Sequence, residues 1–300
     1  MGHGSSKPKK SKSSKNTSTS STSTSSKQHK PEPEPEIDWV HNEDTFTSFK
    51  QLELALRQKG HLEVCQLIVG VDFTGSNEKQ GGPPYYDHLN LHHVSSTNPN
   101  PYEQVLQIMC EALAAFDTDQ LIDTFGFGDD KTEDRAVFPF CVMQTNLGVV
   151  EAPCIKLEGV LQRYREIVAH VKMSGPTSFE PIIRKAIDLV KERNSYHILV
   201  IICDGAVSSG SKQESIDAIV EASNYPLSII CIGVGKGPWD TMEHFDDEIL
   251  GRKFDNFQFV HFHDVMTSQS ENKRAEFAKN AMMEVPKQYA YIKKHMNVQC

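Results

Sequence analysis

The sequence of 300 residues has no apolar stretch long enough to cross a bilayer, and no apolar segment follows its N-terminus as a signal peptide would require. It also has no C-x-x-C pair, and its seven cysteines are an odd number. These absences predict a cytoplasmic protein, with the nucleus as a second compartment. They also predict cysteines that are reduced thiols of the core rather than disulfides or zinc ligands.

Acidic side chains are absent from residues 1–30, a segment of serines and threonines with seven lysines. The whole chain has a net charge of −9, so the residues after this segment carry −16. An acidic body argues against a surface that binds nucleic acid. Because residues 1–36 offer no side chains that could form a core, we expect a disordered basic tail with a Pro-Glu spacer. A folded domain at 37–290 and a short tail at 291–300 complete the predicted organisation.

The first six residues, MGHGSS, fit the N-myristoylation pattern M-G-x-x-x-[ST], which predicts acylation at Gly2. One myristoyl chain binds membranes only marginally, and a polybasic segment is the usual second signal. The lysines that follow therefore predict attachment to the anionic inner face of the plasma membrane. The basic run at 7–12 leaves a nuclear import signal open as the alternative.

Segments with strand and helix periodicity alternate along the rest of the chain. Apolar runs predict strands at Cys65–Val71, Leu121–Phe127, Ala136–Met143, Tyr196–Cys203, Leu227–Val234 and Phe257–Phe262. Pro139 places the third of these at a sheet edge. Amphipathic patterns predict helices at Thr47–Lys59, Tyr102–Phe116, Leu157–Val171, Phe179–Lys191, Gln213–Ser223, Trp239–Phe245 and Glu271–Met283. This alternation predicts an α/β fold: a doubly wound, mostly parallel central sheet with helices on both faces.

Three polar clusters lie where ligands bind in such a fold, near the carboxyl ends of strands. They are DFTGS at 72–76 after the first strand, SGPTS at 174–178 before a helix, and DG at 204–205 after the most apolar strand. Together they offer two carboxylates and three hydroxyls, from Asp72, Thr74, Ser76, Thr177 and Asp204. Mg²⁺ prefers such oxygen ligands, and the incomplete set leaves a coordination position for an acidic group of a partner. The alternative is that these residues only cap helices and shape turns.

The pattern resembles the metal-ion-dependent adhesion site of von Willebrand factor A domains, whose usual first motif is D-x-S-x-S. Thr74 stands at the first hydroxyl position and keeps the oxygen. Wider segments, among them VGVDFTGSN, YREIVAHVKMSGPTSFEPII and HILVIICDGAV, are similar to copines over about residues 45–290. They are more similar still to the copine-type domain of plant RING ubiquitin ligases. The resemblance implies the A-domain fold, one Mg²⁺ or Mn²⁺ ion at the five residues, and an adaptor that recruits protein partners.

Two departures from these families limit what the resemblance implies. Copines carry tandem C2 domains ahead of the A domain, and the plant ligases carry a RING with closely spaced zinc ligands; neither is found in this sequence. We therefore expect a binding protein and not an enzyme, since hydrolase and protease signatures are also missing. A ubiquitin ligase, or a substrate-recruiting component of ubiquitination, stays open as the alternative. The loop histidines His88, His92 and His93 are expected to be exposed.

Overall fold

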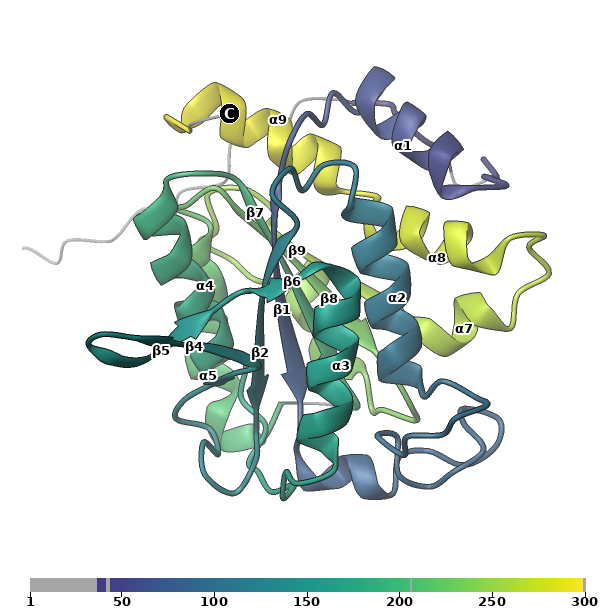
Figure 1. The fold of residues 1–300 in the computed structure, drawn as a ribbon. Helices are drawn as coiled ribbons and strands as arrows, with labels where there is room; N and C mark the ends of the chain where they lie inside the picture. The colour runs from purple at the N-terminus through teal and green to yellow at the C-terminus, as the bar shows by residue number, and fades with distance from the viewer. Residues whose placement is uncertain (1–36, 42–43, 206, 299–300) are drawn as a thin grey trace, which may run out of the picture.

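The computed structural model describes residues 37–41, 44–205 and 207–298 (Figure 1). Its main sheet has the strand order β3-β2-β1-β7-β8-β9, with the short strand β6 paired to β2. The strands are β1 Gln66–Asp72, β2 Leu121–Phe127, β3 Phe138–Pro139, β6 Cys154–Ile155, β7 His197–Cys203, β8 Leu227–Gly233 and β9 Phe257–His261. The long strands pair in parallel, whereas β3 and β6 pair antiparallel with β2. The predicted doubly wound, mostly parallel sheet is confirmed.

Helices cover both faces of this sheet. They are α1 Phe49–Gln58, α2 Pro101–Leu113, α3 Lys156–Val168, α4 Glu180–Arg193, α5 Lys212–Ala222, α6 Asp240–Asp247, α7 Phe262–Met266, α8 Lys273–Ala281 and α9 Val285–His295. In strand β7, Val200 and Ile202 pack in the core with α2, α3, α8 and α9, while Leu199 and Ile201 pack in the core with α4, α5 and α6. Every residue of β7 is buried, as a parallel strand between two helix layers requires.

The chain leaves the sheet in opposite directions after its two central strands. β1 and β7 are neighbours, yet β1 is followed by β2 on one side and β7 by β8 on the other. In α/β folds ligands bind at such a switch point, beyond the carboxyl ends of the strands. Asp72 is the last residue of β1 and Asp204 directly follows β7, so both lie at this point.

The strand predicted at Ala136–Met143 is divided in the structure. Its first part is β3, which lies at the sheet edge as Pro139 predicts. Its second part belongs to β4 Cys141–Thr145, which pairs with β5 Gly148–Ala152 in a separate hairpin. This hairpin projects from the domain beside α4 and α5 in Figure 1. The sequence prediction missed it because its apolar residues are adjacent rather than alternating.

The prediction of reduced thiols is wrong for one pair of cysteines. Cys141 and Cys154 form a disulfide, with their Cα atoms 5.6 Å apart. The physical reason is the hairpin, whose register places Cys141 opposite Ala152 and returns the chain to its starting point. Cys65, Cys110, Cys203 and Cys231 are buried free thiols, as predicted.

The C-terminal boundary predicted at residue 290 falls inside α9, which continues to His295. Tyr291 and Ile292 are buried in the core, so the domain extends beyond the predicted boundary. Helices α7 and α9 were not predicted. Residues 1–36, with Gly2 and the basic tail, lie outside the described residues. In the part of the chain that the structure describes, no helix has both the length and the apolar composition to span a bilayer.

Candidate metal centre

The carboxylate of Asp72 closes strand β1 and is fully buried. The backbone N–H of Thr74 donates to its Oδ1 at 2.7 Å. Its second oxygen, Oδ2, is buried without a hydrogen-bond partner among the described residues, and the same holds for Oδ2 of Asp204. A buried carboxylate oxygen without a partner costs free energy unless a cation or a donor reaches it. The neighbouring central strands β1 and β7 thus bring two such oxygens to the carboxyl ends of the sheet.

Two hydroxyl groups connect these carboxylates. Thr74 Oγ1 and Ser76 Oγ lie 3.0 Å apart, and Ser76 Oγ donates to Asp204 Oδ1 at 3.0 Å. The chain makes this possible by entering a 3₁₀ turn, η1 Gly75–Glu78, directly after Thr74. The structure therefore places Asp72, Thr74, Ser76 and Asp204 in one cluster.

Thr177 reaches the same region through its backbone. Its segment pairs with the loop after β1 through a bridge between Ser174 and Thr74. On the other side, Thr177 N–H donates to Ser208 Oγ at 3.0 Å, and Ser208 N–H donates to the Thr177 carbonyl at 2.9 Å. Thr177 is 8% exposed. Its backbone is therefore joined to the segment after β7, and its place as the fifth ligand stays a prediction.

The buried environment of the cluster disfavours the charged forms of its two carboxylates. Burial raises the pKa of Asp72 and of Asp204, and the negative charge of Asp72 raises that of Asp204 further. A divalent cation would reverse this penalty because it favours both ionised forms. In the described residues no group of three or more His, Cys, Asp or Glu side chains could hold a metal. A metal at this cluster would have to use the hydroxyl oxygens as well as the two carboxylates. Carboxylates with hydroxyls fit a hard ion such as Mg²⁺ or Mn²⁺.

His92 contacts the backbone of Asp72 and is buried, whereas the sequence predicted an exposed loop histidine. Its side chain is fully buried, and burial lowers its pKa to about 3, so the ring is neutral. His92 Nε2 lies 2.8 Å from the carbonyl oxygen of Asp72, which can only accept, so this nitrogen carries the proton. Nδ1 then accepts from the Tyr164 hydroxyl at 2.8 Å. The ring stacks between Phe73 and Tyr102 and fixes the end of β1.

Asn77 holds the loop after β1 from its far side. Its Nδ2 donates to the carbonyl of Thr74 at 3.1 Å. Its Oδ1 accepts from the Tyr102 hydroxyl at 2.7 Å, which fixes the orientation of the amide. Asn77 is fully buried, so these bonds replace its hydration. The sequence prediction missed this residue because a single asparagine beside a motif carries no periodic signal.

Gly128 lets strand β2 approach the cluster closely. Its φ of +82° belongs to the left-handed region that favours glycine. A Cβ at this position would lie 2.4 Å from Thr74 Cγ2 and 3.4 Å from Asp72 Oδ1. The turn after β2 therefore borders the site, and any side chain at residue 128 would displace Thr74.

Comparison with protein families identifies the chain. The Copine family model matches residues 90–300. The chain is 47% identical over 259 residues to the E3 ubiquitin-protein ligase RGLG1 of Arabidopsis thaliana, covering 82% of this chain and 51% of that protein. It is also 44% identical over 253 residues to Copine family protein 2 of Caenorhabditis elegans, covering 84% of this chain and 3% of that protein. The chain belongs to the copine family.

The copine domain described here is a part of longer architectures in many relatives. The chain spans about half the length of the Arabidopsis ligases RGLG1 and RGLG2 that it matches. Among solved structures, a von Willebrand factor type A protein from Catenulispora acidiphila is similar with 13% identity and a TM-score of 0.44, covering 73% of this chain and 43% of that one. The α/β fold of this copine domain follows from its own strand order.

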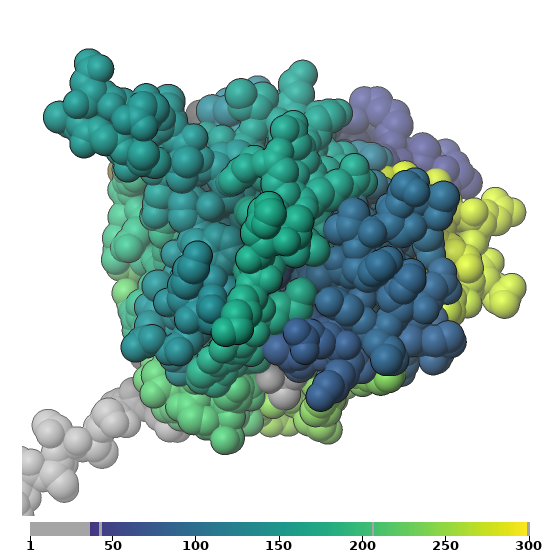
Figure 2. Space-filling view, turned by 60° about the horizontal axis from the view of Figure 1, so that its bottom comes forward, coloured from purple at the N-terminus to yellow at the C-terminus, as the bar shows by residue number. Residues whose placement is uncertain are grey.

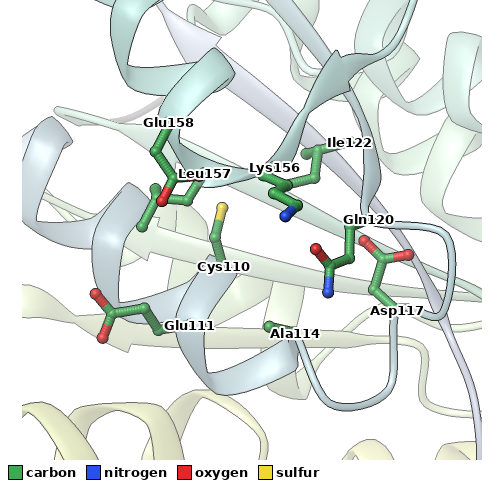
Figure 3. A pocket seen from close by; sticks show the side chains of 9 residues that line it. All are labelled: Cys110, Glu111, Ala114, Asp117, Gln120, Ile122, Lys156, Leu157 and Glu158. Atoms are coloured by element: carbon green, nitrogen blue, oxygen red, sulfur yellow. The ribbon is translucent and has the colours of Figure 1, made fainter.

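A pocket of the copine domain lies near the amino ends of the strands, at the opposite end of the sheet from the candidate metal centre at their carboxyl ends (Figure 3). It has a volume of about 250 Å³ and lies between the end of α2, the start of β2 and the start of α3. Asp117 lines it, and its Oδ1 is buried without a hydrogen-bond partner in the described residues. None of the residues that line this hollow carries a hydroxyl group, unlike the cluster at Asp72. Asp117 therefore offers a buried carboxylate that serves as a control for the candidate metal site.

Proposed function

We propose that this copine domain is a metal-dependent protein-binding adaptor. In this proposal Asp72, Thr74, Ser76, Thr177 and Asp204 hold one Mg²⁺ or Mn²⁺ ion. The observation that carries it is the pair of buried, unpaired oxygens, Asp72 Oδ2 and Asp204 Oδ2, at the switch point of the sheet. Burial raises the pKa of both carboxylates, and the charge of Asp72 raises that of Asp204 further, so their ionised forms are costly; a divalent cation would offset that cost.

When bound, the ion supplies positive charge and an open coordination position for the carboxylate of a partner. The protein's own residues fix the positions of the ligand oxygens. His92 and Asn77 hold the backbone of the loop after β1, and Ser76 holds the carboxylate of Asp204. The donors are therefore oriented before a partner arrives, which lowers the ordering cost of binding.

The surface around the cluster is suited to a polar partner. The segments that follow β1 and β7 adjoin on the face that Figure 2 brings forward. Beside Thr177, a hollow of about 370 Å³ is lined by three serines, by Arg135 and by the carboxylates of Asp134, Glu180 and Glu214. A partner that presents an acidic side chain to Asp72 and Asp204 would lay its flanking residues over this polar hollow.

Thermal unfolding of the full chain tests the metal site. A ligand at a hundredfold excess over its Kd stabilises the folded state by about 2.7 kcal/mol, which raises the Tm of a domain of this size by roughly 5–10 °C. We expect Mn²⁺ to give such a rise relative to EDTA, and Asp204→Asn to abolish it. Asp117→Asn, which changes a buried carboxylate elsewhere, keeps the rise. An equal rise in Asp204→Asn, or none in the unchanged protein, contradicts the site.

The partner class is tested by selecting a random peptide library on the immobilised protein. In Mn²⁺ we expect enrichment of peptides that contain Asp or Glu, and in EDTA we expect that enrichment to vanish. The Asp204→Asn variant provides the matched surface without the ligand oxygen. Peptides without acidic residues, or equal capture in EDTA, would contradict binding through the metal.

We also propose that the basic tail tethers the domain to the inner face of the plasma membrane. The support is the pattern for acylation at Gly2 together with the seven lysines of residues 1–30. Each lysine near an anionic leaflet contributes about 1 kcal/mol. Gly2→Ala should move the protein from the membrane fraction to the soluble fraction of cells. An unchanged distribution would rule the anchor out.

A role in ubiquitination is the second candidate function. It is favoured by the names of the Arabidopsis relatives, E3 ubiquitin-protein ligases, at 45–47% sequence identity. We propose that this chain recruits substrates and does not itself transfer ubiquitin. Incubation with purified E1 and E2 enzymes should therefore give no autoubiquitination. Ubiquitin chains formed by the purified protein would overturn the assignment as a non-enzyme.

A further inference from the structure

The β4–β5 hairpin carries exposed apolar side chains on both of its faces. Their exposed fractions are 55% for Val142, 55% for Met143, 98% for Leu147, 64% for Val149 and 40% for Val150. Five of the ten large apolar side chains exposed in the described residues belong to this hairpin, so exposed apolar surface is concentrated on this one element; these five side chains are called the patch below. Figures 1 and 2 both show the hairpin projecting from the domain.

We propose that two copies of this chain associate through the hairpin, with β4 of one copy pairing antiparallel to β4 of the other. Within the described residues β4 pairs only with β5, so its outer edge has backbone groups free for a further strand. The disulfide between Cys141 and Cys154 joins the two ends of the hairpin and limits its freedom before association. The proposal is independent of the metal site.

The distribution of charge favours β4 as the strand that pairs. Residues 141–150 contain no charged side chain, although the chain after residue 30 has a net charge of −16. Two copies of so acidic a domain repel each other, and an uncharged strand is where they approach with the smallest penalty. Strand β5 is less suitable because it contains Glu151, which pairs with Lys185 of α4.

The register of the hairpin makes β4 complementary to itself. Met143 lies opposite Val150 within one copy. Antiparallel pairing centred on Met143 would align Val150, Met143 and the same two residues of the second copy in one row across four strands. Apolar pairs across neighbouring strands each contribute roughly 0.2–1 kcal/mol. On the opposite face, Val142 would lie opposite Gln144 of the second copy, and no like charges would meet.

Other occupants fit the hairpin less well. Residues 2–36 of this chain contain no large apolar side chain, so the side chains of the tail cannot cover the patch, and the acyl chain proposed at Gly2 is directed to the membrane. A lipid bilayer could receive the apolar side chains but would leave the backbone groups of the β4 edge unpaired. A second copy satisfies both the side chains and the backbone.

The size of the hairpin predicts a weak dimer. A strand of five residues is about 17 Å long, and the contact is smaller than the roughly 800 Å² per partner of a standard interface. We therefore expect a dissociation constant on the order of tens of micromolar. Because salt screens the repulsion between the acidic bodies, added NaCl should strengthen the dimer.

Sedimentation velocity of the full chain, from about 1 to 500 μM around that expected range, tests the proposal. We expect the mass to rise from 33.7 kDa towards twice that value, in EDTA as well as in Mn²⁺. Met143→Lys should keep the protein monomeric throughout. Leu250→Lys is the matched control, because Leu250 is an apolar residue outside the hairpin with 76% exposure, and it should dimerise like the unchanged protein. Failure of the metal site leaves this result unaffected.

A cysteine cross-link tests the register. Met143→Cys in a Cys300→Ser background should form a covalent dimer on mild oxidation, because directly opposed residues bring their Cβ atoms to about 4.5–5.5 Å. Leu250→Cys in the same background should not. A mass of 33.7 kDa at every concentration overturns the proposal. So does a monomer that binds neutral lipid vesicles through Met143, which would make the hairpin a membrane contact.

Discussion

Ser76 donates a hydrogen bond from its Oγ to Oδ1 of Asp204, 3.0 Å away and 128 residues later in the chain. The bond joins the loop after β1 to the segment after β7. These two strands are neighbours at the switch point, where the chain continues to β2 on one side and to β8 on the other. Neither loop alone carries both carboxylates. The candidate site therefore exists only when the central strands are paired, and the proposed metal binding would be coupled to folding.

Replacing Ser76 by Ala should weaken Mn²⁺ binding by at least about tenfold, because the hydroxyl that holds Asp204 is lost together with a candidate ligand oxygen. Isothermal titration calorimetry measures the change. Thr74→Ser is the matched control, since serine keeps the oxygen and should leave the affinity close to that of the unchanged protein. Equal affinities for Ser76→Ala and the unchanged protein would exclude Ser76 from the site.

Replacing His92 by Phe should destabilise the domain by about 1–3 kcal/mol. The ring stack with Phe73 and Tyr102 is kept, but both short hydrogen bonds of the imidazole are lost. The Asp72 carbonyl keeps only the longer bond from Asn77 Nδ2 at 3.4 Å, and the Tyr164 hydroxyl keeps only its bond to Asn100 Oδ1 at 3.2 Å. Urea unfolding in EDTA measures this loss. His93→Phe, at an exposed neighbour, should change stability by no more than about 0.5 kcal/mol. A His92→Phe protein as stable as its His93→Phe control would contradict the supporting role.

Much of the fold could be predicted because its central strands are buried on both sides. The run at 197–203 is apolar at nearly every position, which only a strand between two helix layers requires. The residues Asp72, Thr74, Ser76 and Asp204 could be predicted to meet because parallel strands end at one edge. Thr177 was located by its motif, and its backbone bonds to Ser208 were not visible in the sequence.

The features that sequence patterns missed depend on contacts between distant segments. His92 lies in a polar segment, and only the folded chain brings it against Asp72 and Tyr164. The Cys141–Cys154 disulfide depends on the return of a hairpin whose strands lack alternation, so neither gave a signal. In contrast, α9 has an apolar pattern at Val285, Tyr289 and Ile292, which is helical and could have been recognised.

Stability should depend on pH through Asp246. Burial raises its pKa to about 7 from an ordinary value of 3.8. The folded protein thus holds this proton more tightly than the unfolded chain, so the stabilisation is present at low pH and is lost as the pH rises through about 7.

Asp246→Asn replaces the carboxyl by an amide that does not ionise, so the loss of stability with rising pH should disappear. Relative to the unchanged protein, the variant should gain about 1–2 kcal/mol between pH 4 and pH 7, after allowance for partial solvent screening. Urea unfolding at several pH values measures the difference. Asp247 is unsuitable as a control because its charge itself raises the pKa of Asp246. Glu243→Gln changes an exposed carboxylate of the same helix that is not among the charges acting on Asp246, and it should not reproduce the gain. A gain for Asp246→Asn that appears equally at pH 4 would show that ionisation is not its cause.

The disulfide should stabilise the domain in oxidising buffer. A loop of this size, closed between Cys141 and Cys154, contributes about 2–3 kcal/mol. Cys141→Ser should remove this amount, as measured by guanidinium unfolding without reductant. In dithiothreitol the variant and the unchanged protein should become equal. A difference of the same size in both buffers would show that the serine acts on packing and not through the disulfide.

The most direct test of the metal centre is a crystal of the full chain grown with Mn²⁺ and measured for anomalous scattering. The account predicts one strong peak among the oxygens of Asp72, Thr74, Ser76, Thr177 and Asp204, and its loss in Asp204→Asn. A map without a peak there, or with its strongest peak beside Asp117, would contradict the account.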